Sequence, residues 1–471
     1  MILSAKFMKL FSAEHTLKNT VPLGEMPSDK TILKRTLRVA WPSMLESFLV
    51  SLVGVVDTIM VSALGSYAIA AVGLTGQPKF ICLAAFFSLN IAVSAVVARR
   101  KGERDRDGAN NVLRQALLVT GILTVLITIL AFVFAEPILR LAGTNADTHA
   151  AATVYFRILT AGMVFNVFSM VINAAQRGVG NTKIAMRTNL ASNAVNIVLN
   201  YLLIGGNFGF PKLGVAGAAI ATVAGTVVAL GMSILSISHT DGFLYLFYHN
   251  VKLKFDKKTL GTLANIGSAS FAEQIFLRFG FLVYAMVVAR LGTAAFAAHQ
   301  IGMNVINISF SIGDGLSVAS VALVGQSLGE KRADLAKIYG AFCQRIGLLC
   351  SLTLAIAYAT VGRDVFMLFS NEPQILDYGA EIMRFVAIIV VLQVSQVIYS
   401  GALRGAGDTR YVALVSLISV AVIRPLAGWL FVYPLGLGLT GAWIGLMLDQ
   451  FMRFLLSRRR FRGGKWMNIK L

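Results

Sequence analysis

The chain has 471 residues, of which 56% are hydrophobic and only 14% are charged, and its mean hydropathy is +0.73. This composition excludes a soluble globular protein of that size and indicates a polytopic membrane protein. The net charge of +20 raises nucleic acid as an alternative partner, which the distribution of the charges disfavours.

Hydrophobic runs separated by short polar connections predict an all-α fold with about twelve transmembrane helices, since about 20 apolar residues span a bilayer as a helix. The N-terminal segment has no signal-peptide pattern and is predicted to be a cytosolic tail with an amphipathic helix around Ile2–Leu17. The predicted spans are 39–63, 79–98, 116–135, 153–175, 184–205, 214–238, 262–289, 296–323, 341–361, 382–403, 411–432 and 437–456.

The lysines and arginines alternate between the two sides of the predicted membrane. Of the 42, 33 lie before residue 39, after residue 452 or in or within about five residues of the even-numbered connections, and seven lie in or equally close to the odd ones. Arg278 and Arg424 fall inside spans. By the positive-inside rule, we expect a multi-pass protein of the cytoplasmic membrane with both termini in the cytoplasm.

The first span carries two acidic residues, Glu46 and Asp57. An ionisable group inside an apolar span is costly, so it is by default a candidate functional residue. Asp57 follows Trp41 by about 16 residues, which is roughly 24 Å of helix and places it in the outer half of the span. Glu46 lies on nearly the same helix face, closer to the cytoplasm.

Three uncharged polar residues are predicted at the depth of Asp57. Asn196 and Asn200 lie one turn apart in the fifth span, and Thr222 lies in the sixth. A carboxylate among amide and hydroxyl oxygens could hold sodium or stabilise either protonation state of the acid. The alternative for the two asparagines and Thr222 is ordinary hydrogen bonding between membrane helices.

The chain contains an internal repeat with an offset of 227 residues. The offset relates Glu46 to Glu273, Leu64-Gly65 to Leu291-Gly292, Gly102-Glu103 to Gly329-Glu330, Arg177-Gly178 to Arg404-Gly405 and Thr182 to Thr409. It predicts two pseudo-symmetric six-helix lobes in parallel orientation, which in transporters alternate access by rocking. The predicted segments are an N-terminal tail (1–38), lobes at 39–245 and 262–456, a linker (246–261) and a basic tail (457–471).

Several stretches in this order resemble the multidrug and toxic compound extrusion (MATE) family. They are Asp57–Gly65, the paired loops Arg177–Thr182 and Arg404–Thr409, Gly214–Thr222 and Ala298–Ile301. The resemblance covers roughly residues 30–460. It implies a twelve-helix, two-lobed exporter of organic, often cationic compounds that is driven by sodium or proton antiport, closer to the DinF-like than to the NorM-like branch.

In the paired loops, we expect Gly178 and Gly405 to take left-handed conformations, and Asn181 and Asp408 to cap the following helices. This interpretation assigns the loops a structural role.

The second repeat does not copy the Asp57 cluster, because Tyr284 occupies the position equivalent to Asp57. The resemblance implies that members of the NorM-like branch carry an acid at one position of the tenth span. This chain has Gln393 at that position. Candidate contacts for substrate or a second cation are Glu273, Gln393, Tyr284 and Arg424. Glu273 could instead form a structural ion pair with Arg424 or His299. Because the repeat relates Glu46 to Glu273, Glu46 is a candidate structural acid as well.

The sequence contains no phosphate-binding loop, zinc-protease motif or clear nucleophile with its base, so we expect no enzyme and no cofactor. Cys82, Cys343 and Cys350 lack metal-type spacing, so sodium at Asp57 is the only metal considered. We expect a monomer in the lipid bilayer with drug-like substrates. A lipid-linked precursor flippase of related fold is the alternative, and a receptor or scaffold is a weaker one.

Overall fold

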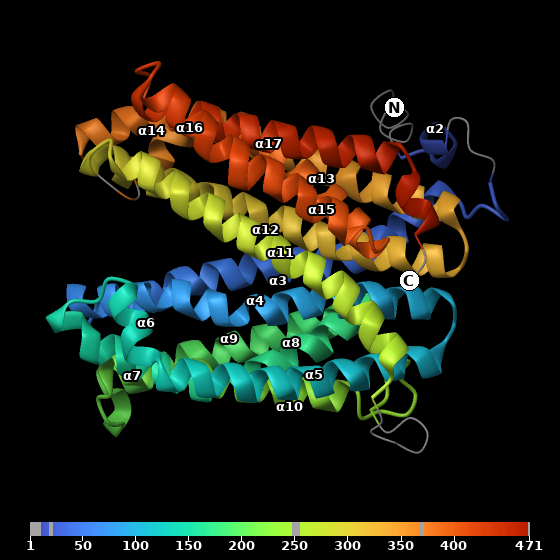
Figure 1. The fold of residues 1–471 in the computed structure, drawn as a ribbon, viewed down its shortest axis with the longest axis horizontal. Coiled ribbons are helices and arrows are strands. Elements are labelled where there is room, and N and C mark those ends of the chain that lie inside the picture. Colours follow the sequence, from blue (N-terminus) through green and yellow to red (C-terminus); the bar gives the residue numbers. More distant parts are fainter. Residues whose placement is uncertain (1–10, 18–21, 247–254, 368, 370–371, 470–471) are drawn as a thin grey trace. The chain divides into compact units, whose positions relative to one another are not determined.

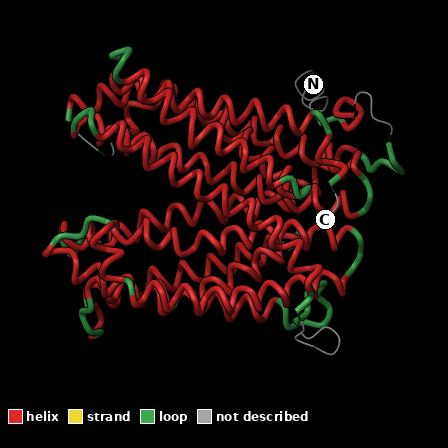
Figure 2. The backbone as a smooth tube through the Cα atoms, in the orientation of Figure 1, coloured by secondary structure: helices red, strands yellow, loops and turns green. Residues whose placement is uncertain are grey.

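The structure is a computed structural model that describes residues 11–17, 22–246, 255–367, 369 and 372–469. The backbone of these residues forms helices and loops without any strand (Figure 2). The all-α prediction is therefore confirmed. Of the amphipathic helix predicted around Ile2–Leu17, only Ala13–Leu17 is described as helix, and residues 1–10 lie outside the described part of the chain.

The elements follow one another from blue to red in Figure 1. The first repeat contains α2 (Ala13–Leu17), α3 (Asp29–Ser62), α4 (Ser66–Gly102), α5 (Arg106–Val133), α6 (Ala135–Leu141), α7 (Ala146–Ala161), α8 (Met163–Gly178), α9 (Thr182–Gly205), the 3₁₀ turn η1 (Asn207–Gly209) and α10 (Gly214–Ser236). The second contains α11 (Lys257–Ala289), α12 (Thr293–Gly329), α13 (Ala333–Met367), α14 (Pro373–Gly405), α15 (Thr409–Ser416), the π-helix η2 (Leu417–Ile423), α16 (Arg424–Val432), α17 (Gly438–Arg462) and η3 (Lys465–Asn468).

Each of the twelve predicted spans overlaps a helix or an interrupted helix. Among the described residues, nine helices are long and apolar enough to cross a membrane, and α7 with α8, bent by 48° at Gly162, makes a tenth. The remaining two predicted spans coincide with α9 and α17, which have 24 and 25 residues. The eleventh span is α15 to α16, in which the π-helix η2 directly precedes Arg424-Pro425.

The helix boundaries reproduce the internal repeat. The bounds of α4 and α12 differ by 227 residues at both ends, as do the ends of α3 and α11 and the starts of α9 and α15. The backbone angles repeat as well, with φ of 59° at Arg104 and 58° at Lys331. The two halves therefore share one local fold.

The contacts divide the chain into two compact units. One unit joins the residues up to Ser47 with those from Ser268 onward, and the other extends from Phe48 to Gly267. Helix α3 therefore contributes its first part to one unit and its second part, with Asp57, to the other. In the unit of Phe48–Gly267, α9 packs extensively on α10, and α4 packs on α8. In the other unit, α12 packs most extensively on α14.

The paired loops after α8 and α14 correct one sequence prediction. Gly180 and Gly407, not Gly178 and Gly405, take positive φ values of 86° and 88°. Gly178 and Gly405 end their helices, where an added Cβ would collide with a carbonyl oxygen of the neighbouring helix. Their lack of a side chain therefore serves close helix packing.

The capping prediction for these loops is also only partly met. Asn181 and Asp408 stand at the N-cap positions of α9 and α15, but neither side chain makes a capping hydrogen bond. The Asp408 carboxylate instead accepts from Nε of Arg460 at 2.7 Å. These loops retain a structural role through different contacts.

Candidate functional site

Asp57 lies on the part of α3 that belongs to the unit of Phe48–Gly267, at a cavity of about 260 Å³. Four further helices of the same unit line this cavity, and their contributions include Val72 of α4, Tyr155 of α7, Asn200 of α9 and Thr222 of α10. The Asp57 carboxylate is only partly buried, whereas Asn196 and Asn200 are 5% and 2% exposed. The acid therefore has access to space that a small cation or water can occupy.

Two asparagine amides hold the Asp57 carboxylate. Asn200 donates from Nδ2 to Oδ1 of Asp57 at 2.8 Å. The surrounding donors and acceptors orient the Asn196 amide with its nitrogen 2.8 Å from the same Oδ1 and its oxygen 3.2 Å from Oγ1 of Thr222. The structure thus brings together the four residues that the sequence places at one depth.

Close packing of two helices positions this cluster. An added Cβ at Gly217 or Gly225 of α10 would collide with the carbonyl oxygen of Leu203 or Ser192 on α9. The two glycines therefore let α10 approach the α9 backbone closely on either side of Thr222.

The cluster has the chemistry to hold a cation. Oδ1 of Asn200 is buried and has no hydrogen-bond partner in the described residues, so it is an available acceptor. Together with the Asp57 carboxylate and the oxygens of Asn196 and Thr222 it offers the hard oxygen ligands that sodium prefers. The same carboxylate can bind a proton instead, and its amide partners can adapt to either state.

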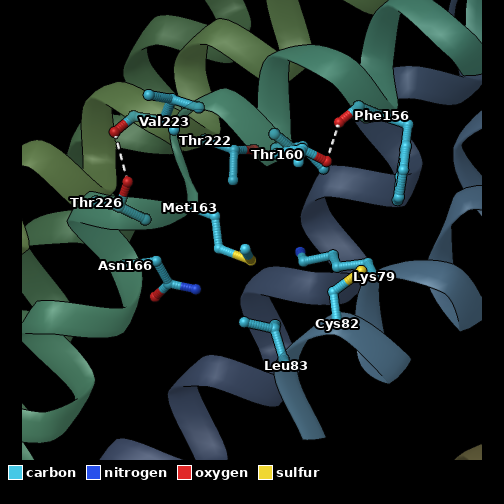
Figure 3. A pocket seen from close by; sticks show the side chains of 12 residues that line it. Lys79, Cys82, Leu83, Phe156, Thr160, Met163, Asn166, Thr222, Val223 and Thr226 are labelled. Carbon is cyan, nitrogen blue, oxygen red and sulfur yellow. Dashed lines mark hydrogen bonds between the residues drawn. The ribbon is translucent and has the colours of Figure 1, made fainter. Parts of the chain in front are cut away.

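A second cavity in the same unit contains a charged residue that the sequence analysis missed. Lys79, with Cys82, Thr160, Met163, Asn166 and other residues, lines a cavity of about 40 Å³ (Figure 3). The predicted span 79–98 places Lys79 at the membrane boundary, whereas α4 begins at Ser66 and Lys79 lies well inside the helix. The Gln77-Pro78 dipeptide before Lys79 resembles a loop in sequence, although Pro78 lies inside the helix.

The equivalent position in the second repeat has a different role. Tyr284 is buried and donates from its hydroxyl to the carbonyl oxygen of Ala442 at 2.7 Å. Its ring contacts His299 edge-on. A tyrosine committed to a backbone acceptor in this way packs the helices of that unit together.

Glu273 forms an ion pair, but with a partner other than the predicted ones. Nη2 of Arg404 donates to its Oε1 at 2.5 Å, and the hydroxyl of Ser416 donates to the same oxygen at 3.3 Å. The predicted pairing with Arg424 or His299 is wrong, because Arg404 at the end of α14 binds Glu273. Arg424 instead donates twice to Oδ2 of Asp449, at 2.5 and 3.0 Å.

Two other candidate residues of that unit, Gln393 and Glu46, are buried. Gln393 lies in the buried face of α14, and its Oε1 has no hydrogen-bond partner among the described residues. Glu46 is 6% exposed and belongs to the unit that includes residues from Ser268 onward. Asp314 of α12 accepts from the Ser47 hydroxyl at 3.3 Å. These residues belong to the unit that does not contain Asp57.

The sequence matches a known family twice. The model of the MatE family matches residues 42–202 and 269–430, one segment in each repeat. A protein of Thermotoga maritima described as probable multidrug resistance protein NorM is 28% identical over 454 residues, which cover 95% of this chain and 96% of that protein. The uncharacterized transporter YisQ of Bacillus subtilis is 26% identical, covering 93% of this chain and 96% of its own.

Solved structures share the fold over nearly their whole length. A crystal structure of MATE in complex with MaD3S superposes with a TM-score of 0.85 at 25% identity, covering 92% of this chain and 97% of that one. The outward-facing structure of a multidrug resistance MATE family transporter of the MOP superfamily has a TM-score of 0.84 at 25% identity and covers 94% and 100%.

Proposed function

The chain belongs to the MatE family, and we propose that it is a secondary active efflux transporter that exports drug-like organic compounds, often cationic, by antiport with protons or sodium. The likeness to curated multidrug resistance proteins over almost the whole chain supports this activity. Within the family, we further predict that the chain belongs closer to the DinF-like than to the NorM-like branch.

The observation that carries the coupling role is the set of partners of Asp57. The buried acids Glu273 and Asp449 each accept hydrogen bonds from an arginine, so a fixed cation already offsets their negative charge. Asp57 accepts from uncharged amides and forms no ion pair within 4 Å among the described residues. Its charge is therefore available for a mobile cation.

In this mechanism Asp57 binds the coupling cation when the site is open to the outside and releases it when the site is open to the cytoplasm. Binding changes the net charge among α3, α9 and α10 and biases the equilibrium between the two access states. A substrate that prefers the opposite state is then exported at the expense of the cation gradient. The two six-helix repeats provide the elements that rock against each other.

We also propose the oligomeric state, membrane and topology that the sequence predicts for the protein. The protein acts as a monomer in the cytoplasmic membrane. Both of its termini lie in the cytoplasm, because 33 of its 42 lysines and arginines lie on that side of the predicted topology. It retains the predicted division into lobes at 39–245 and 262–456 with the linker 246–261. It requires no cofactor besides the coupling ion.

Replacement of the acid tests the coupling role. In liposomes that contain the purified protein and are energised by a proton or sodium gradient, Asp57→Asn should lower the efflux of a cationic dye at least tenfold. The matched control is Asp241→Asn, since Asp241 is an exposed acid of the same unit. Undiminished gradient-driven transport by Asp57→Asn would refute the coupling role, and lipid scrambling without dye transport would favour the flippase.

A further inference from the structure

Lys79 is a cation inside the membrane-spanning helix α4 that the proposed mechanism does not yet use. Its side chain extends into the cavity between α4, α7, α8 and α10 and ends near Met163 (Figure 3). Most of the lining is apolar, with Leu83, Phe156 and Val223 among its residues. An ammonium group in such surroundings is costly unless a negative charge offsets it.

The described residues offer Lys79 no direct partner. None of the hydrogen bonds or ion pairs within this described part of the chain involves its Nζ. The polar groups of the cavity are uncharged, as in Thr160, Asn166 and Thr226. Because these groups cannot balance a full positive charge, an ammonium at this position needs an acid beyond the cavity wall to stabilise it.

Asp57 meets this requirement. Thr222 lines both the cavity of Lys79 and the cavity of Asp57, so the two cavities adjoin at this residue. Helix α4 supplies Gly73 to the Asp57 cavity and Lys79 to the other, which are six residues or roughly 9 Å of helix rise apart. Asp57 and Lys79 are close enough to interact electrostatically, and such an interaction is strong in an apolar interior.

Among the residues that the structure describes, no other charged side chain lines either cavity. The titratable groups among the described lining residues are Asp57 on α3, Lys79 and Cys82 on α4, and Tyr155 on α7, whereas the described lining residues of α8, α9 and α10 include none. A thiol and a phenol have ordinary pKa values of about 8.5 and 10 and are neutral at physiological pH. The electrostatics of the site therefore depend on Asp57 and Lys79.

We propose that Lys79 is a fixed countercharge of Asp57 that sets the cation affinity of the coupling site. With its ammonium in place, the cation-free state contains a negative and a positive charge that offset each other. A proton or sodium ion arriving at Asp57 then meets a standing positive charge, which weakens its binding and promotes its release to the cytoplasm. This role rests on the proposed coupling function of Asp57.

Removal of the ammonium is the decisive change. Lys79→Met keeps the length of the side chain without its charge, and the coupling cation should bind roughly tenfold more tightly, as expected for two unit charges about 10 Å apart at an effective dielectric constant of about 20. In liposomes driven by a proton gradient, the midpoint pH of transport should rise by about one unit. Under sodium drive, the half-saturating sodium concentration should fall by a similar factor.

Two further variants separate charge from packing. Lys79→Arg keeps the positive charge and should keep the midpoint within about 0.3 units of the wild type, a margin well below the roughly one-unit effect of a unit charge at this range. Lys212→Met makes the same substitution at an exposed lysine of the same unit and should change nothing. Elution as a monodisperse peak shows that each variant is folded.

The outcomes distinguish this inference from the proposed function. If Asp57→Asn abolishes coupled transport but folded Lys79→Met retains the wild-type midpoint and sodium dependence, the countercharge role is wrong and the coupling role stands. Equal shifts in Lys79→Met and Lys79→Arg would also overturn it, because they would trace the effect to packing. Coupled transport that survives in Asp57→Asn would instead remove the proposed function itself.

Discussion

At the scale of single residues, the hydrogen-bond partners of an acid inside a span indicate whether it has a structural role or can bind a mobile cation. Glu273 and Asp449 are bound by Arg404 and Arg424, and removal of either arginine would break a buried ion pair, which typically costs about 3–5 kcal/mol. Asp57 is bound by the amides of Asn196 and Asn200, which do not neutralise it. Sequence alone identifies Asp57 from its depth, but it does not reveal which arginine reaches which acid.

The contact between Asn200 and Asp57 yields a prediction at this scale. Asn200→Ala removes the donor at 2.8 Å, and a hydrogen bond to a charged group contributes about 1.5–3 kcal/mol. The ionised carboxylate loses this stabilisation, so the midpoint pH of proton-driven transport should rise by about one to two units. The pH profile of dye transport in liposomes measures the shift.

The matched control for this variant is Asn207→Ala. Asn207 donates to the carbonyl oxygen of Tyr201 in the turn after α9, away from Asp57. Its substitution should leave the midpoint in place. An unchanged midpoint in Asn200→Ala would show that this amide does not stabilise the carboxylate.

At the scale of elements, the packing of α9 on α10 decides where the cluster forms. Periodicity and loop signals predict that both helices exist, and counting along them predicts the common depth of Asn196, Asn200 and Thr222. The glycine contacts that bring the two backbones together depend on the tertiary structure. For the same reason the sequence predicts the wrong left-handed glycines in the paired loops, and it predicts Lys79 at the boundary of a span although Lys79 lies well inside α4.

Two glycines of α10 test the role of this packing. A Cβ at Gly225 would collide with the carbonyl oxygen of Ser192, whereas a Cβ at Gly231 has no neighbour within 4 Å. Gly225→Ala should therefore destabilise the protein by about 1–3 kcal/mol through overpacking and impair transport. Gly231→Ala should be neutral or slightly stabilising because alanine favours the helix more than glycine. Thermal unfolding in detergent compares the two variants, and equal melting temperatures would contradict this account.

At the scale of the whole molecule, the duplication predicts the architecture but not the function of each half. The offset of 227 residues recurs in the helix boundaries, so much of the fold follows from the sequence. The halves differ in their chemistry: the first has Asp57 with its amides, and the second has Tyr284 at the equivalent position and acids bound by arginines. A single cation site in the first repeat is therefore the central claim.

The most direct test measures whether a cation gradient alone concentrates an organic cation through Asp57. Liposomes with the purified protein are given a pH gradient without sodium and, separately, a sodium gradient at fixed pH. At least one gradient should drive accumulation of the dye beyond equilibrium in the wild type, and Asp57→Asn should reach equilibrium only. The account would be contradicted if neither gradient drove accumulation in the wild type or if Asp57→Asn still accumulated the dye.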